Sequence, residues 1–282
     1  MITYDMTLPL FQNEKNNVDQ IFGMCNFRMI SPDELTKADG NVEGLDQLAL
    51  SENVHSFLAT LDKNGETRLP QRAYLATRHA IRHLQLPPGQ TVLEREMTEI
   101  LGMSRTPVRE ALVRLEMEGW VRLIPRRGFI VAPIVADDLQ QIYEVVEALD
   151  GIAGSLATVR ATSEELDRLD CLIEEQEKAL ESGDLLAWTD LDDQFHHNIV
   201  DLAQNPRLRG IMDSQSDQLY RARLYTINLR PKPTRSIMEH KAIVSVMRTG
   251  EPQAARMMLQ SHRYRARNEI IEAIRSKTMP SI

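Results

Sequence analysis

The spacing of hydrophobic residues changes several times between residues 69 and 134. It follows a helical period in three segments and then alternates in two short segments, as in strands. Pro87-Pro88-Gly89 separates the first two helical segments, and Pro125-Arg126-Arg127-Gly128 separates the two strands. The pattern therefore predicts three helices and a hairpin with a basic tip, which is a winged helix-turn-helix. The predicted segments are residues 69–84, 94–101, 107–118, 120–124 and 129–132.

From about residue 137 onward the hydrophobic spacing is helical throughout, and short polar segments divide it into about six helices. Residues that favour helix ends mark the divisions. Thr162-Ser163-Glu164-Glu165 has the sequence of a capping box. Gly183-Asp184 and Asn205-Pro206 are typical of helix starts, and Pro231 interrupts a helical segment. Amphipathic helices with short connections favour a helical bundle.

We therefore expect a mainly α protein, in which an N-terminal winged helix-turn-helix precedes a C-terminal all-α helical bundle. A chain of 282 residues has room for two domains that each bury a core. The segment before them is acidic and turn-rich, shows no recognisable chemistry, and could form a helix at 43–60. The expected divisions are a partly ordered extension at 1–68, the winged helix-turn-helix at 69–134 and the helical domain at 135–282.

Charge is distributed unevenly along the chain. The formal net charge is −8, yet the winged segment carries ten arginines, no lysine and six glutamates. A compact arginine-rich module inside an acidic protein is typical of a nucleic-acid-binding surface. A solvated basic helix face would have the same composition, so charge alone leaves both interpretations open.

Cysteine content and hydropathy favour the reducing cytoplasm. Cys25 and Cys171 lie far apart, so they indicate neither a disulfide framework nor a cysteine-based metal site. No apolar run reaches the roughly 18–20 residues that a membrane span needs, and the N-terminus lacks a signal-peptide pattern. We therefore expect a cytoplasmic protein with no membrane partner.

Residues 102–112 predict the start of a helix suited to DNA. Thr106 is the expected N-cap and Pro107 the expected first helical residue, where a missing N–H costs nothing. Arg105 precedes this cap, and Arg109 lies one turn into the helix. Both guanidinium groups therefore flank a helix N-terminus, whose free N–H groups and dipole favour anions. Such a helix end suits DNA phosphates and the guanine edges beside them.

In order and spacing, this module resembles the GntR family of bacterial transcription regulators. The matching segments are Leu86-Pro87-Pro88-Gly89, Leu93-Glu94-Arg95-Glu96, residues 102–112, Arg114-Leu115, Gly119 and Arg126-Arg127-Gly128. The resemblance implies that a dimer binds operator DNA through the recognition helix and the wing. The residues that it implies at the DNA are Arg95, Arg105, Thr106, Arg109, Arg127 and Gly128. Arg95 could instead pair with Glu99, one helical turn away.

The helical region carries a second set of polar residues that could bind a metal. Asp192 and His196 are four residues apart and share a helix face, while His240 and His262 lie on two later helices. One carboxylate and three imidazoles that converge would suit a divalent first-row metal ion. Spacing does not establish convergence, so a local Asp–His pair with two unrelated surface histidines is an alternative.

The arrangement of these residues resembles the FCD effector domain of the FadR branch of the family. The matching segments are Asp192-x-x-Phe195-His196, Asn205-Pro206, Glu239-His240-Lys241-Ala242-Ile243 and Ser261-His262. The resemblance implies a divalent metal, zinc or alternatively nickel or manganese, facing an effector cavity. The implied ligands are Asp192, His196, His240 and His262. His197 lies one residue off the shared face, where it would be solvated.

The first effector helix departs from this resemblance. Relatives that bind carboxylate ligands often have an arginine and a glutamate where this chain has Val146 and Asp150. Arg221 and Arg223, or the metal itself, are then the candidates for holding an anionic effector. A less charged effector is the alternative.

The leading hypothesis is a repressor that binds an inverted repeat of double-stranded operator DNA as a homodimer and responds to a small effector, a metal or both. One alternative is a metalloenzyme that uses the same four polar residues. The chain lacks an HExxH-type glutamate base, and an enzyme would leave the winged module unexplained, so we expect no enzyme. The other alternative is a DNA-binding protein whose helical domain is purely structural.

Overall fold

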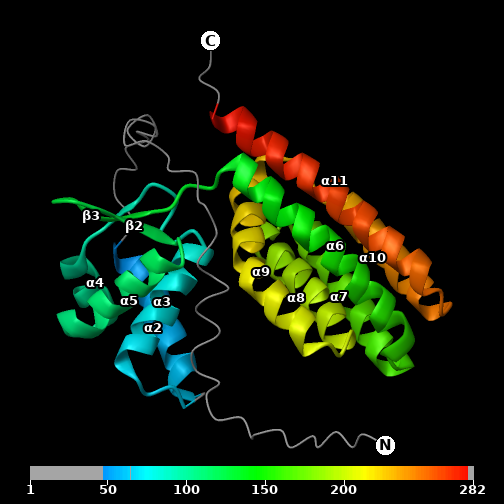
Figure 1. The fold of residues 1–282 in the computed structure, drawn as a ribbon, viewed down its shortest axis with the longest axis horizontal. Helices are drawn as coiled ribbons and strands as arrows, with labels where there is room; N and C mark the ends of the chain where they lie inside the picture. The colour runs from blue at the N-terminus through cyan, green and yellow to red at the C-terminus, as the bar shows by residue number, and fades with distance from the viewer. Residues whose placement is uncertain (1–46, 64, 279–282) are drawn as a thin grey trace, which may run out of the picture. The chain divides into compact units, whose positions relative to one another are not determined.

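The computed structural model describes residues 47–63 and 65–278 (Figure 1). This part of the chain is mainly helical, which confirms the expected fold class. Its elements are α2 (Gln47–Lys63), α3 (Leu69–Arg82), β1 (Thr91–Val92), α4 (Glu94–Leu101), α5 (Arg105–Met117), β2 (Val121–Ile124), β3 (Gly128–Val131), α6 (Ala136–Arg160), α7 (Ser163–Ser182), α8 (Leu185–Leu202), α9 (Pro206–Thr226), the 3-10 helix η1 (Ile227–Leu229), α10 (Thr234–Arg248) and α11 (Pro252–Thr278). None of the helices described here is both long and apolar enough to cross a membrane.

Helices α3, α4 and α5 and the three described strands form the predicted winged helix-turn-helix. The strands are antiparallel in the order β1-β3-β2, so that Phe129 of β3 lies opposite Val92 on one side and Leu123 on the other. Phe129 and Val131 are buried and alternate with less buried neighbours, as the period of a strand requires. Strand β1 was not predicted because two residues are too few to show an alternating pattern.

Helix α2 contributes to the core of this module. Its buried residues recur every three or four positions and belong to the same apolar cluster as those of α3, α4 and α5. They are Leu50, Val54, Leu58 and Leu61. The sequence places this helix in the extension at 1–68 without a role, whereas its apolar face is part of the winged-helix core. Residues 1–46 of that extension lie outside the described residues.

The start of α5 differs from the prediction. The helix begins at Arg105, with Ser104 as N-cap and without a side-chain capping hydrogen bond. Thr106 is therefore not the N-cap, and Pro107 is the third helical residue rather than the first. Proline is tolerated throughout the first turn because no N–H group there has a helical partner, so it does not define the first residue. Gly119 follows the helix with a φ of +78°, as expected for a C-terminal glycine.

The described residues from Ala136 onward form six α-helices, as the hydrophobic pattern predicts. Thr162 and Glu165 form the predicted capping box. The Glu165 N–H donates to Thr162 Oγ1 over 3.2 Å, and the Thr162 N–H donates to Glu165 Oε2 over 2.8 Å. Asp184 and Asn205 accept hydrogen bonds from the first turns of α8 and α9, as helix caps should.

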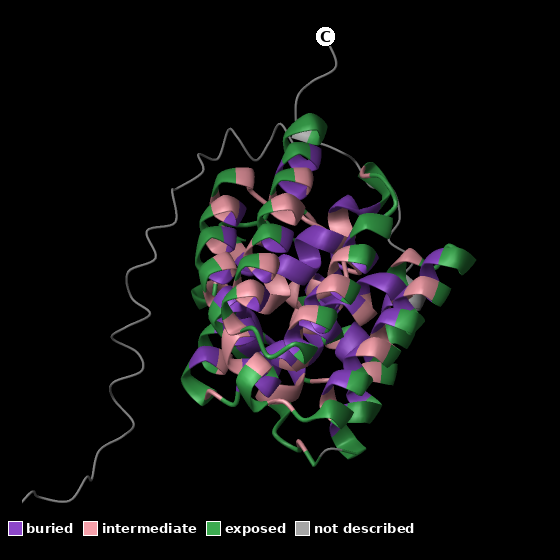
Figure 2. Cartoon of the chain, turned by 90° about the vertical axis from the view of Figure 1, so that its right-hand side faces the viewer, coloured by how far each residue is buried: buried purple, intermediate pink, exposed green. Residues whose placement is uncertain are grey.

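Helices α6 and α11 pack along each other (Figure 1), with glycines of α6 against side chains of α11. A Cβ added to Gly154 would clash with Leu259 Cδ1, and one on Gly151 would lie 2.8 Å from the Gln260 side chain. Larger residues at these positions would therefore force the helices apart. Figure 2 shows the buried residues on the sides of the helices that face neighbouring helices.

Candidate functional site

Three histidines from three helices converge inside the helical domain. His196 of α8, His240 of α10 and His262 of α11 each offer one ring nitrogen, and these nitrogens lie within 4.8 Å of one another. The Nε2 atoms of His196 and His262 are 3.3 Å apart. All three residues are buried. The later two histidines are therefore not unrelated surface residues.

Asp192 lies one helical turn before His196 and also faces the cluster. Its Oδ1 is 3.9 Å from His196 Nε2 and 3.7 Å from His240 Nε2. Its Oδ2 is 3.3 Å from the Nε atom of Arg223. One carboxylate oxygen therefore faces the histidines, while the other lies beside a guanidinium group.

Hydrogen bonds from neighbouring side chains orient two of the rings. His240 Nδ1 lies 2.9 Å from Gln176 Oε1, and His262 Nδ1 lies 2.8 Å from Glu239 Oε2. The Gln176 amide is itself oriented by donating from Nε2 to the Leu191 carbonyl over 3.2 Å. Because both oxygens accept, each Nδ1 is the donor in these hydrogen bonds, and each Nε2 faces the cluster. An acceptor behind the ring is typical of metal-binding histidines.

The surroundings favour neutral imidazoles. Burial lowers the pKa of His196 and His240 well below the ordinary value, and the neighbouring His262 and Arg263 add to this effect. His240 Nε2 is buried and has no hydrogen-bond partner among the described residues. Three imidazoles and one carboxylate form a donor set that fits a divalent cation. The residues therefore fit the metal that the resemblance implies.

The two arginines predicted to hold an anion are buried and already engaged. Arg223 lies beside Asp192 and donates from Nη2 to Asp193. Arg221 donates from Nη2 to the backbone carbonyl of Ala132, which follows β3. Burial lowers the pKa of Arg221 to about 10. Contact of either residue with an effector stays a prediction.

An ion-pair network extends from the histidine cluster to helix α3. Asp193, the neighbour of Asp192, accepts from Arg223 and also from Arg82 Nη2 of α3 over 2.7 Å. Arg82 Nε in turn lies 2.8 Å from Asp217 Oδ1 of α9. These side chains are at most 20% exposed, so solvent screens their interaction only in part. The network therefore connects α8 and α9 with the winged module.

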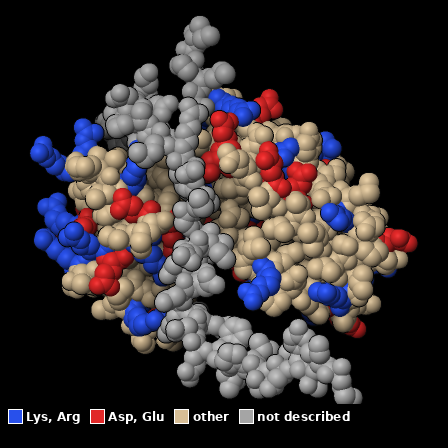
Figure 3. Space-filling model, in the orientation of Figure 1, with Lys and Arg blue, Asp and Glu red and all other residues tan. Residues whose placement is uncertain are grey.

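The side chains predicted to contact DNA are exposed on the winged module. Figure 3 shows Lys and Arg gathered along the left-hand edge of the view, over α4, α5 and the β2–β3 hairpin. The exposed members are Arg95, Arg105, Thr106, Arg109 and Arg127. The Arg109 side chain is 72% exposed, and its Nε lies 3.8 Å from Glu94 Oε1. The guanidinium groups at the start of α5 can therefore reach a ligand in solution.

Gly128 has a structural role that the sequence did not indicate. It has a φ of +85°, and an added Cβ would lie 2.7 Å from Leu93 Cδ2 and 3.0 Å from the Val92 carbonyl oxygen. Glycine is therefore needed for β3 to pack against the segment that leads into α4. This requirement is independent of any contact between Gly128 and DNA.

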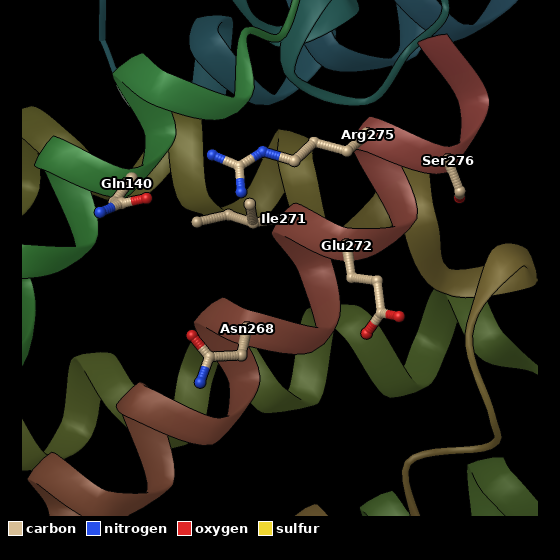
Figure 4. Close-up of a pocket in the computed structure, with 6 residues that line it drawn as sticks. All are labelled: Gln140, Asn268, Ile271, Glu272, Arg275 and Ser276. Carbon is tan, nitrogen blue, oxygen red and sulfur yellow. The ribbon is translucent and has the colours of Figure 1, made fainter. Parts of the chain in front are cut away.

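A surface pocket lies between α6 and α11, away from the histidine cluster (Figure 4). Its lining residues are Gln140, Asn268, Ile271, Glu272, Arg275 and Ser276. None of them belongs to the four-residue cluster, and Arg275 is paired with Asp137 over 3.1 Å. We assign no function to this pocket.

Comparisons with known proteins cover both modules. Residues 69–131 match the family described as bacterial regulatory proteins, gntR family, and residues 141–265 match the FCD domain. The Nta operon transcriptional regulator of Aminobacter aminovorans is 32% identical over 190 residues, which are 67% of this chain and 88% of that protein. The chain belongs to the GntR family.

Another relative is an uncharacterized HTH-type transcriptional regulator in the TAR-I ttuE-ttuC' intergenic region of Agrobacterium vitis. It is 43% identical over 131 residues, which are 45% of this chain and 77% of that protein. The solved structure of E. coli McbR/YncC has a similar fold, with a TM-score of 0.65 at 22% identity over 74% of this chain and 99% of that one. The protein is accordingly a DNA-binding transcription regulator and not an enzyme.

The departure in the first effector helix of this GntR-family chain has a structural counterpart. Val146 is fully buried in the core, and Asp150, one turn later, is also fully buried. Asp150 accepts from the Nε atom of Arg263 on α11. An aspartate on a buried helix face requires a cationic partner, so its presence there predicts that such a partner exists. The partner lies 113 residues away, however, and sequence reasoning did not find it.

Proposed function

We propose that this GntR-family protein is a repressor whose operator affinity depends on a divalent metal ion and a small effector. The observation that carries the proposal is the convergence of His196, His240 and His262 beside Asp192. These four residues would hold the ion, and the ion would supply positive charge for an effector. Zinc is the first candidate because it favours nitrogen ligands and tetrahedral sites, and nickel and manganese are the alternatives.

Two copies of the chain would bind a short inverted repeat in double-stranded DNA, joined through the helical domain. The exposed Arg105 and Arg109 support entry of the α5 N-terminus into the major groove, where guanidinium groups contact phosphates and guanine edges. Arg127 at the wing tip would lie near the minor groove. The remaining proposed contacts are Arg95, Thr106 and Gly128. A dimer bound in this way would exclude other proteins from the promoter.

The ion-pair network supplies a route between the two modules. Arg223 lies between Asp192 and Asp193, and Asp193 also binds Arg82 of α3. A cation that binds Asp192 would leave Arg223 free to pair more fully with Asp193. The negative charge of Asp193 that remains for Arg82 would then change. Two ligation states would therefore hold α3 differently, as linkage between effector and operator requires.

A metal-binding measurement tests the proposal. Elemental analysis of the purified protein should find about one ion per chain in wild type, and a His240→Ala variant should lose most of it. His197→Ala is the matched control, since His197 instead bonds the Asp193 carbonyl over 2.8 Å. Operator affinity should change when a chelator removes the ion from wild type. An ion-free wild type that cannot be loaded, with an operator affinity indifferent to chelator, would favour a purely structural helical domain.

The DNA-binding part has its own test. Arg105→Ala and Arg109→Ala should each weaken operator binding by about 1–3 kcal/mol, while circular dichroism shows an intact fold. Arg248→Ala, on an exposed end of α10, is the control. Wild-type operator affinity in both α5 variants would contradict the docking model.

A further inference from the structure

The hydroxyl group of Tyr74 joins α3 to the end of the recognition helix α5. Tyr74 is 2% exposed, and its hydroxyl donates to Glu118 Oε2 over 2.6 Å. The same oxygen accepts a hydrogen bond of 3.0 Å from Arg78 Nη1. Glu118 is the C-cap residue of α5, the helix whose other end carries arginines proposed to contact DNA. The hydroxyl is therefore the middle member of a hydrogen-bonded chain that ends on α5.

The chemistry of the three groups allows one direction for these hydrogen bonds. A guanidinium group only donates and a carboxylate only accepts, so the hydroxyl must accept from Arg78 and donate to Glu118. Burial, and then the hydrogen bond to Glu118, raise the pKa of Tyr74, which keeps the hydroxyl protonated. Each hydrogen bond in such a chain polarises the next, so a change at one end affects the other.

At its lower end the chain holds the last turn of α5. Glu118 Oε1 accepts from Arg114 Nε over 2.9 Å, and Arg114 Nη1 donates to Gln71 Oε1 of α3 over 2.8 Å. The Arg114 guanidinium carbon also lies 3.7 Å from the centroid of the Tyr74 ring. Helix α5 has 13 residues and is thus a stiff rod of about 20 Å. Side chains that fix its C-terminal end therefore also influence where its N-terminal end points.

At its upper end the chain reaches the helical domain. Arg78 Nε donates to Asp217 Oδ2 of α9 over 2.6 Å. The side chains of Arg78 and Asp217 are 30% and 15% exposed, so solvent screens their attraction only in part. Asp217 also pairs with Arg82, through which the ion-pair network from the histidine cluster reaches α3. The chain therefore continues from α9, through α3, to α5.

We propose that Tyr74 is a positioning residue through which the helical domain sets the orientation of α5; this inference rests on the proposed docking of α5 on the operator. When Asp217 holds Arg78, the guanidinium donates to Tyr74, and the polarised hydroxyl holds Glu118. If α9 withdraws Asp217, the hydrogen bond to Glu118 weakens and the end of α5 is released. The apolar core between α3 and α5 keeps the module folded in both states. A released helix must be ordered again at the operator, which lowers the affinity.

A mutant cycle between the two ends of the chain tests the proposal in the full-length protein. The probe is the DNA duplex that wild type selects from a randomised pool, and fluorescence anisotropy measures its affinity with chelator present throughout. Asp217→Asn and Glu118→Gln should each weaken binding by about threefold to tenfold, because an amide offers one acceptor oxygen where a carboxylate offers two. The double variant should bind about as well as the weaker single variant, since one broken link already disconnects the chain.

Tyr74→Phe removes the middle link and keeps the ring. In this background the effects of Asp217→Asn and Glu118→Gln should become independent and multiply. Asp213→Asn is the matched control, because Asp213 lies one turn earlier on α9 and pairs with Arg209 of the same helix over 2.7 Å. Its effect should multiply with that of Glu118→Gln even when Tyr74 is present.

The outcomes separate this inference from the proposed function. Effects of Asp217→Asn and Glu118→Gln that multiply when Tyr74 is present, or a coupling that survives Tyr74→Phe, would overturn the inference. Variants with a lower melting temperature but the DNA affinity of wild type would also overturn it, because Tyr74 would then be purely structural. Wild-type affinity in Arg105→Ala would instead contradict the docking of α5 itself. Should Tyr74→Phe fail to fold, the cycle between the two partly exposed carboxylates decides the question.

Discussion

The buried ion pair between Asp150 and Arg263 allows a direct test of what holds α6 against α11. Asp150 is fully buried, and Arg263 is 3% exposed. Arg263 Nε donates to Asp150 Oδ2, while Oδ1 is buried with no partner that the described residues provide. Asp150→Asn or Arg263→Met would therefore leave one charge in the core with neither water nor a counterion.

The expected cost follows from this burial. Removing one partner of a buried ion pair destabilises a protein by about 3–5 kcal/mol. In a protein of this size each kcal/mol lowers the melting temperature by about 2–4 °C, so each single variant should melt roughly 6–20 °C below wild type. The double variant Asp150→Leu with Arg263→Met removes both charges and keeps apolar volume. It should lose much less than the two single variants together.

Urea unfolding followed by tryptophan fluorescence measures these values, with chelator present so that bound metal does not contribute. Trp188 is buried in the helical domain and Trp120 in the winged module, so Trp188→Phe and Trp120→Phe backgrounds separate the two transitions. Arg248→Met is the control, since this exposed partner of Asp167 should contribute less than about 1 kcal/mol. Two results would refute the reasoning. Either the single variants are as stable as this control, or the double variant loses as much free energy of unfolding as the two single variants together.

Three further predictions concern the winged module and its link to the effector domain. Gly128→Ala should destabilise the module by about 1–3 kcal/mol and weaken operator binding, because the strain of a positive φ and the clash with Leu93 add to each other. Gly89 has a φ of +82° and open space around it, so Gly89→Ala should show only the smaller cost of the backbone strain in urea unfolding. Equal losses of stability in the two variants would contradict the clash between residue 128 and Leu93. Burial, helped by the neighbouring Arg82 guanidinium, lowers the pKa of His83 to about 4, so the unfolded state takes up a proton first as the pH falls from the ordinary value of 6.5. The free energy of unfolding should therefore decline as the pH falls from 6.5 to 4. His83→Asn should reduce this decline by roughly 1–2 kcal/mol, after allowance for the partial exposure of the ring. An unchanged dependence of the free energy of unfolding on pH would contradict the prediction. Arg82→Met should leave zinc binding intact but reduce the zinc-dependent change in operator affinity, measured by fluorescence anisotropy, and an undiminished change would exclude the network as the route.

Helix ends were predictable where the signal acts within a few residues. The capping box at Thr162 and the caps at Asp184 and Asn205 lie where the sequence predicts them, since a side chain and the first-turn N–H groups decide each one locally. Pro107 led to a wrong prediction of the first residue of α5, because a proline without an N–H group is tolerated anywhere in the first turn. The role of α2 was not predictable, because its apolar stripe identifies a helix but not the surface that it covers.

The candidate site shows the same division between local and long-range information. Four-residue spacing on one helix correctly brings Asp192 and His196 to a common face. Glu239 precedes His240 in the sequence, yet consecutive residues of a helix point about 100° apart, so its carboxylate cannot orient that ring. It accepts from His262 of the next helix instead, and Gln176 of α7 orients His240. The residues of the candidate cluster were thus predictable from periodicity and resemblance, whereas the side chains that orient their rings depend on which helices pack together.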